Sequence, residues 1–151
     1  MIRILCIGKK HELWVREGIE RYQKRLRKPW DIEWVFLPHS ASEGSHARQD
    51  ESERLLSRLR PHEYVILLDE RGRLLDSPAL SRALESPLDT SRSITIIIGG
   101  AYGVNDDLSA RADLVWSLSP LVFPHQLVRL ILTEQLYRAQ EIATGRPYHH
   151  D

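Results

Sequence analysis

Five short apolar runs, separated by segments with helical spacing, are the feature that most constrains the fold of this chain. The runs are almost entirely apolar instead of alternating between apolar and polar residues. Strands of this kind are typical of parallel sheets that helices cover on both faces. The sequence therefore predicts an α/β fold with a mainly parallel sheet and helices on both faces, whose strands are residues 3–7, 32–37, 64–68, 94–98 and 114–118.

Apolar spacing and boundary residues predict the helices. Pro29 ends the first of them. Ser77 is expected to cap a helix that has Pro78 at its first position, and Asn105 or Asp106 is expected to cap a shorter one. The predicted helices are residues 12–27, 49–59, 77–85, 106–112 and 126–144.

The connections are predicted to be short, and none divides the chain. Residues 39–48 are rich in Ser, Gly and His and are expected to form a mobile loop. The third strand is expected to end in a turn at residues 69–72, where Gly72 suits a positive φ. A chain of 151 residues can bury one core. We therefore expect one domain over residues 1–151.

Composition excludes several classes of protein. Apolar residues make up 42 % of the chain and charged residues 28 %, as in ordinary globular proteins. The longest apolar stretches, of about five residues, are far shorter than the roughly 20 of a membrane helix, and residues 1–5 resemble a strand instead of a signal peptide. Cys6 is expected to be a buried structural thiol. The seven His show no metal-binding spacing. We therefore expect a cytoplasmic protein without a metal ion.

The charge is balanced overall but uneven along the chain. There are 21 basic and 21 acidic residues, so the net charge is zero. A solvated helix face is the plain interpretation of a local basic cluster, whereas two such clusters in a dimer would create a field that attracts RNA. The cluster consists of Arg21, Lys24, Arg25, Arg27 and Lys28.

A binding site is predicted where the last two strands end, since ligands of open α/β sheets lie outside the carboxyl ends of the strands. Gly99, Gly100 and Gly103 follow one strand, but their spacing is neither the dinucleotide fingerprint nor a phosphate loop. A cofactor with adenine and ribose but no phosphate, such as S-adenosylmethionine, suits a loop of this kind. Residues 118–123 could hold the adenine by backbone hydrogen bonds and apolar contact. The alternatives are a tight turn and a buried crossover.

Polar residues near the predicted last helix are candidates for acid–base chemistry. His125 and Arg129 lie four residues apart, hence on one face of the helix. Near a helix N-terminus the imidazole of His125 is expected to be neutral, although it could merely cap the helix. Glu134 and Arg138 are expected to form a structural ion pair. Tyr148 and His149 close the chain, where the alternative is a frayed end.

Several of these segments occur together in one order, and together they resemble the ribosomal RNA large subunit methyltransferase H family, whose members are small SPOUT methyltransferases. The similarity covers essentially the whole chain. The sequence departs from the family at Ala101-Tyr102, where relatives often carry Pro or Ser followed by a polar residue. The segments are Ile4-Leu5-Cys6-Ile7-Gly8-Lys9, Leu67-Leu68-Asp69-Glu70-Arg71-Gly72, Ile97-Ile98-Gly99-Gly100, Trp116-Ser117-Leu118-Ser119, Phe123-Pro124-His125-Gln126-Leu127-Val128-Arg129, Glu134-Gln135-Leu136-Tyr137-Arg138-Ala139 and Pro147-Tyr148-His149.

The resemblance implies a C-terminal trefoil knot, a homodimer and S-adenosylmethionine as methyl donor. It also implies methylation of N3 of a pseudouridine in large-subunit 23S ribosomal RNA, within a subunit or an assembled ribosome. Carried over residue by residue, Gly100 and Gly103 shape the cofactor loop. The cofactor would be held by Leu68, Gly99, Leu118, Ser119, Pro120, Leu121, Val122 and Phe123.

Methylation of a ring nitrogen requires that its proton leave, so a base is expected beside the acceptor. His149 and Tyr148 rank first for this role, followed by His125, with Arg129 stabilising negative charge on the ring carbonyls. Two other functions compete with this one. A non-catalytic ribosome-binding dimer could have the same fold, and a small-molecule enzyme such as a dehydrogenase is disfavoured by the absent dinucleotide fingerprint.

Overall fold

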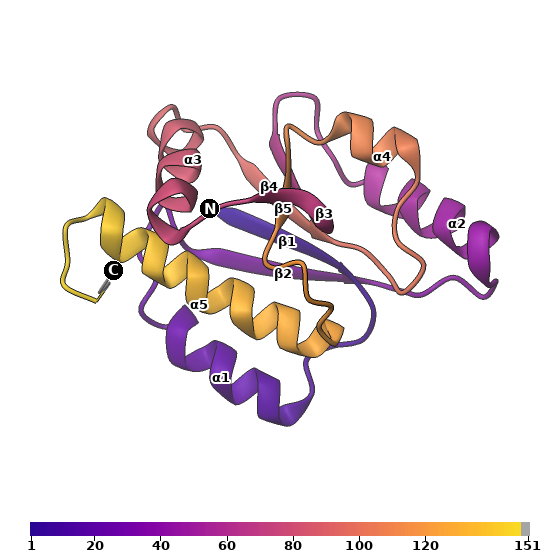
Figure 1. The fold of residues 1–151 in the computed structure, drawn as a ribbon, viewed down its shortest axis with the longest axis horizontal. Helices are drawn as coiled ribbons and strands as arrows, with labels where there is room; N and C mark the ends of the chain where they lie inside the picture. Colours follow the sequence, from indigo (N-terminus) through magenta and orange to yellow (C-terminus); the bar gives the residue numbers. More distant parts are fainter. Residues whose placement is uncertain (149–151) are drawn as a thin grey trace.

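Strands and helices alternate along the chain in the structure, a computed structural model that describes residues 1–148 (Figure 1). The strands are β1 (Ile2–Ile7), β2 (Ile32–Leu37), β3 (Tyr64–Leu74), β4 (Ile94–Ile98) and β5 (Leu114–Ser117). The helices are α1 (Leu13–Gln23), α2 (Gly44–Leu56), α3 (Ser77–Asp89), α4 (Asp106–Arg111) and α5 (His125–Ala143).

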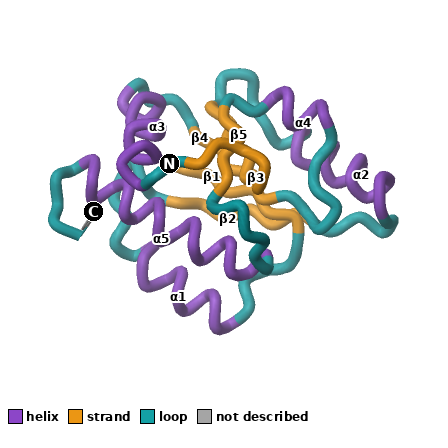
Figure 2. Tube along the Cα trace, in the orientation of Figure 1, coloured by secondary structure: helices purple, strands orange, loops and turns teal. Residues whose placement is uncertain are grey.

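The strands form one sheet in the order β2-β1-β4-β3-β5, and every neighbouring pair is parallel. Figure 2 shows this sheet between two groups of helices. The predicted α/β class with a parallel sheet is therefore confirmed, and each predicted strand is present. The trefoil knot stays a prediction that rests on the family resemblance.

The two faces of the sheet belong to two separate cores. Along β1, Ile2, Ile4 and Cys6 face a core that α1, α3 and α5 cover. Leu5 and Ile7 face a smaller core that α2 and α4 cover. Because side chains alternate along a strand, a run that is apolar at every position supplies both cores at once. This explains why the strands carry apolar residues on both faces, and why Cys6 is buried.

The first two predicted helices have wrong boundaries. The first, α1, ends at Gln23 and not at residue 27, because the chain turns there and Arg25 N–H bonds to the Tyr22 carbonyl. The second, α2, begins at Gly44 and not at residue 49, so the predicted mobile loop is helical in its second half. Ala47 is buried, so this half does have a packing contact.

The region from β3 to α3 also differs from the prediction. Strand β3 continues to Leu74, with an irregularity between Leu68 and Arg73. Gly72 does not have a positive φ. It is needed for close approach, since a Cβ there would lie 2.6 Å from the Val115 carbonyl oxygen of β5. Asp76, not Ser77, caps α3 by accepting the Ala79 N–H, and the helix runs past Pro87 to Asp89.

Candidate cofactor site

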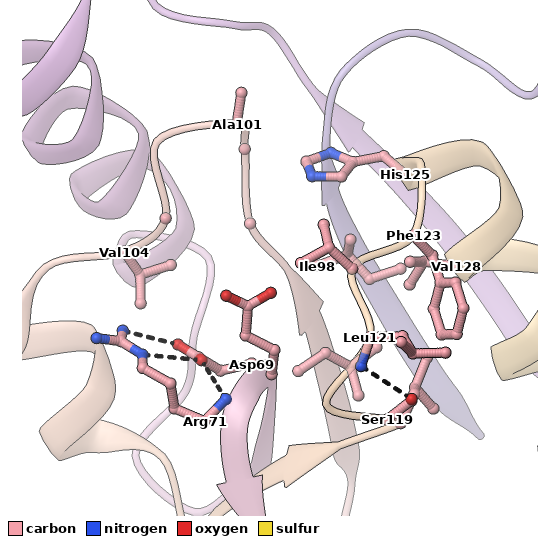
Figure 3. A pocket seen from close by; sticks show the side chains of 17 residues that line it. Asp69, Arg71, Ile98, Ala101, Val104, Ser119, Leu121, Phe123, His125 and Val128 are labelled. Carbon is pink, nitrogen blue, oxygen red and sulfur yellow. Dashed lines mark hydrogen bonds and ion pairs between the residues drawn. The ribbon is translucent and has the colours of Figure 1, made fainter.

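A cavity of about 470 Å³ lies at the carboxyl ends of β4 and β5, beside residues 68–71 in the middle of β3 (Figure 3). This size is within the range of small-molecule sites. Every residue predicted to contact the cofactor lines it except Pro120. The lining consists of Leu68, Asp69, Glu70, Arg71, Ile98, Gly99, Gly100, Ala101, Gly103, Val104, Leu118, Ser119, Leu121, Val122, Phe123, His125 and Val128.

The glycines that follow β4 form a tight turn, and the side chains of Val104 and Glu51 pack closely against it. Gly103 has φ of 78°, and its N–H donates to the Gly100 carbonyl at 3.1 Å. A Cβ on Gly99 would lie 3.0 Å from Val104 Cγ1, and one on Gly100 would overlap the carboxylate of Glu51. The glycines therefore serve both interpretations of the sequence, because they form the turn and they expose backbone to the cavity.

The opposite rim, residues 118–123, offers bare backbone and apolar side chains. Ser117 Oγ donates to the Ser119 carbonyl, and Ser119 Oγ accepts the Leu121 N–H, both at 3.0 Å. These bonds fix the path of the loop. Leu121 is 69 % exposed and Val122 is 78 % exposed. Exposed apolar side chains beside a cavity indicate a surface that a ligand or another molecule covers.

Three charged residues line the cavity and were not predicted as site residues. Asp69, Glu70 and Arg71 follow the first half of β3, and Arg71 Nη2 is 3.1 Å from Asp69 Oδ2 (Figure 3). The hydrogen bond from the Arg71 guanidinium lowers the pKa of Asp69. The sequence pattern around them contributed to the family resemblance, but nothing in their spacing indicates a site. They give the cavity a polar edge.

His125 is the first residue of α5 and lines the cavity (Figure 3). No side chain caps this helix, so His125 is not a cap. Burial lowers the pKa of His125, and the nearby Arg129 guanidinium and His39 lower it further. The imidazole is therefore neutral near pH 7 and can accept a proton.

Arg129 does not line the cavity. It is only 2 % exposed, donates to the Lys9 carbonyl at 2.9 Å, and places its guanidinium carbon 5.2 Å from the centre of the Phe36 ring. Its guanidinium therefore stabilises the segment between β1 and α1 through this hydrogen bond. The predicted role of Arg129 toward the substrate stays a prediction.

Tyr148 lies at the other end of α5 from the cavity. Its ring packs at 4.7 Å on Tyr137 and at 4.9 Å from the Arg138 guanidinium carbon. Arg138 forms the predicted ion pair with Glu134, at 3.2 Å. A helix of 19 residues is about 28 Å long, so Tyr148 lies far from the cavity of its own chain, and its predicted catalytic role stays a prediction. His149 lies outside the described residues.

The basic cluster lies at this same end of the molecule. Its five residues occupy the last turn of α1 and the turn that follows, and all of them are exposed. Arg25 contacts the face of Tyr137, at 6.0 Å from the ring centre. The cluster and Tyr148 thus gather at one end of α5, and the cavity lies at the other end.

Within residues 1–148, no group of three His, Cys, Asp or Glu side chains is arranged to hold a metal ion. No helix in the same range is long and apolar enough to cross a membrane.

The stability of the fold is expected to fall with acidification through His11. Burial, and then the charge of Arg129, lower the pKa of His11 from 6.5 to about 4. The unfolded chain then binds this proton more readily, so stability present above pH 6.5 is lost as the pH falls toward 4. His11→Phe keeps an aromatic ring against Trp34 and Phe36 and should flatten the dependence of the melting temperature on pH in that window. His62→Phe, in an exposed loop, is the matched control for the substitution itself; equal slopes in wild type and His11→Phe would contradict the assignment.

The fold is that of a SPOUT methyltransferase. Residues 1–149 match the family described as "Predicted SPOUT methyltransferase". A probable methylase family protein from Haemophilus influenzae Rd KW20 has a similar fold, with a TM-score of 0.58 over 99 % of this chain and 70 % of that one, at 15 % identity.

Relatives with higher sequence identity show which family of SPOUT methyltransferases the chain belongs to. The chain is 40 % identical to the ribosomal RNA large subunit methyltransferase H of Alkalilimnicola ehrlichii, over 98 % of this chain and 97 % of the relative. It is 42 % identical to the protein of the same name from Desulfitobacterium hafniense, over 98 % of each. The chain belongs to the ribosomal RNA large subunit methyltransferase H family.

Proposed function

We propose that the protein transfers a methyl group from S-adenosylmethionine to N3 of a pseudouridine in large-subunit 23S ribosomal RNA. The observation that carries this function is the cavity between the glycine turn and residues 118–123. The chain is also 40 % and 42 % identical to two named ribosomal RNA methyltransferases, over 98 % of its length. Bare backbone and exposed apolar side chains suit an adenosine, and the turn has neither fingerprint for a phosphate. The residues therefore fit this cofactor.

Each rim of the cavity has a distinct role in this proposal. Residues 118–123 hold the adenine, while Leu68 and Gly99 contact the rest of the cofactor. Gly100 and Gly103 shape the turn. S-adenosylmethionine supplies an activated methyl group on its sulfonium, so the protein contributes mainly by positioning the acceptor.

The acceptor nitrogen must lose a proton, and the chain offers two sources of a base. His125 is neutral and lies at the cavity. His149 and Tyr148 remain the first choice, with Arg129 stabilising charge on the ring. Because Tyr148 lies a helix length from the cavity of its own chain, the tail can act there only from a second copy.

The face formed by α1 and α5 suits this second copy. A groove between the two helices is lined by Trp14, Leu127, Leu130 and Ile131 among others. Trp14 is 55 % exposed and Leu13 is 62 % exposed. An exposed apolar face of this kind is typical of homodimer interfaces.

The homodimer gives a direct prediction. Sedimentation at micromolar concentration should report about twice the 17.5 kDa mass of the chain. Trp14→Glu should shift the protein to a monomer, because a charge would be buried in the interface. Leu74→Glu, at a residue that is 63 % exposed and outside the groove, is the control and should remain dimeric. A monomeric wild type with full activity would refute the dimer.

RNA binding is expected to depend on the basic cluster and on salt. The double variant Lys24→Glu and Lys28→Glu should weaken binding to ribosomal RNA and reduce the slope of affinity against salt, because fewer counterions are released. Arg82→Glu, an exposed residue on α3, is the control. With zero net charge, wild-type binding to naked RNA should be weak, and the ribosome should add shape contacts. Tight binding to bare hairpins that salt does not affect would contradict this.

One experiment separates catalysis from the alternative, a non-catalytic ribosome-binding dimer. The protein is incubated with methyl-labelled S-adenosylmethionine and with naked RNA, subunits or ribosomes, and the labelled nucleotide is mapped. Label on N3 of a pseudouridine in 23S RNA is the expected result. Ribosome binding without cofactor binding or label would favour the alternative.

A further inference from the structure

Glu51 is a buried carboxylate for which the proposed site has no role so far. It lies on α2 and is 3 % exposed, and its Oε2 accepts the Ser40 N–H at 2.9 Å. Its Oε1 is buried and has no hydrogen-bond partner among the described residues. A buried carboxylate oxygen without a partner costs stability. An acidic side chain kept at this cost points to a function of the carboxyl group itself.

The carboxylate lies directly behind the cofactor turn. A Cβ on Gly100 would overlap Glu51 Oε1 and would lie 3.2 Å from Ile7 Cγ2. Gly100 also lines the cavity. The backbone of a single glycine therefore separates the Glu51 carboxylate from the space for the ligand.

Among the described residues, the one ion-pair partner of Glu51 is His39, whose Nδ1 lies 3.8 Å from Oε2, and Oε1 has no hydrogen-bond partner. Within the cavity, Asp69 and Arg71 pair with each other. His39 lies beside Glu51, and Asp50 bonds to the same Ser40. The charged or titratable residues that line the cavity are Asp69, Glu70, Arg71 and His125.

We propose that Glu51 is a specificity-determining residue, whose negative charge favours the cationic cofactor over the neutral product of the reaction. The proposal rests on the proposed function. S-adenosylmethionine carries one more positive charge than S-adenosylhomocysteine, on its sulfonium. Charges interact strongly across a short, water-poor path, so a carboxylate one backbone layer away stabilises the methylated ligand and leaves the demethylated one unaffected. The demethylated product is thereby released more readily.

The test compares two dissociation constants, measured by calorimetry for S-adenosylmethionine and S-adenosylhomocysteine. Glu51→Gln keeps the size of the side chain and removes its charge. It should weaken binding of S-adenosylmethionine roughly tenfold and leave that of S-adenosylhomocysteine nearly unchanged. The control is Asp50→Asn, at the residue before Glu51, whose carboxylate accepts a hydrogen bond from Ser40 Oγ. This variant should leave the ratio of the two constants unchanged.

Each other outcome has a separate meaning. If Glu51→Gln weakens both ligands equally, Glu51 only supports the turn and the proposal is overturned. If Glu70→Gln changes the ratio and Glu51→Gln does not, the discrimination belongs to Glu70 and the proposal is again overturned. A folded wild type that binds neither ligand would overturn the proposed function itself. If Glu51→Gln does not fold, Glu51→Asp, which keeps the charge, must preserve the ratio.

Discussion

Gly100→Val is expected to reduce the affinity for S-adenosylmethionine by a factor on the order of 10² or more. The new side chain has no space, because its Cβ would already overlap the Glu51 carboxylate and lie close to Ile7. Both neighbours are buried, so the turn must move instead, and the backbone it presents to the cofactor moves with it. Calorimetry on protein that circular dichroism shows to be folded measures the loss.

Gly99→Ala provides the graded comparison for this prediction. Its Cβ would meet only the tip of the Val104 side chain, at 3.0 Å, which can shift. The loss of affinity should therefore be much smaller than for Gly100→Val. A folded Gly100→Val protein with unchanged affinity would place the cofactor elsewhere.

His149→Ala is expected to lower the rate of methyl transfer by a factor on the order of 10² or more, while the affinity for the cofactor stays near that of the wild type. The reason is the loss of a proton acceptor rather than of a cofactor contact. Single-turnover rates on ribosomes, measured alongside cofactor affinity, separate the two effects.

Tyr148→Phe is the matched variant for this tail. It keeps the ring that packs on Tyr137 and beside Arg138 and removes only the hydroxyl. A rate loss here would assign part of the effect to hydrogen bonding. If His149→Ala methylates ribosomes at the parent rate, the tail is passive and His125 becomes the better candidate for the base.

Much of the fold could be predicted because a few strong local patterns determine it. The strands at residues 94–98 and 114–118 are apolar apart from Thr95 and Ser117, and each is present as a strand whose residues are mostly buried. The boundaries of α2 could not be predicted, because its sequence is polar and only a few of its residues are buried. For the same reason nothing in a charged helix indicates that Glu51 is buried against the cofactor turn.

The site was predictable where residues adjacent in sequence form it, and not where the fold brings distant parts together. Residues 118–123 line the cavity as expected apart from Pro120, because they directly follow a strand. Spacing alone placed His125 and Arg129 on one face of α5, but only the structure shows that Arg129 points to Lys9. The distance between Tyr148 and the cavity depends on how α5 packs, which no local pattern contains.

The length of α5 has a genetic consequence. If the cavity of one chain works with the tail of another, a chain that carries Gly100→Val and a chain that carries His149→Ala are each inactive alone, yet they should complement each other. In a mixed dimer, the intact cavity of the second chain meets the intact tail of the first, so one of the two sites is restored. The other site combines both defects. Activity that reappears on mixing the two variants would show that the catalytic unit is shared between subunits.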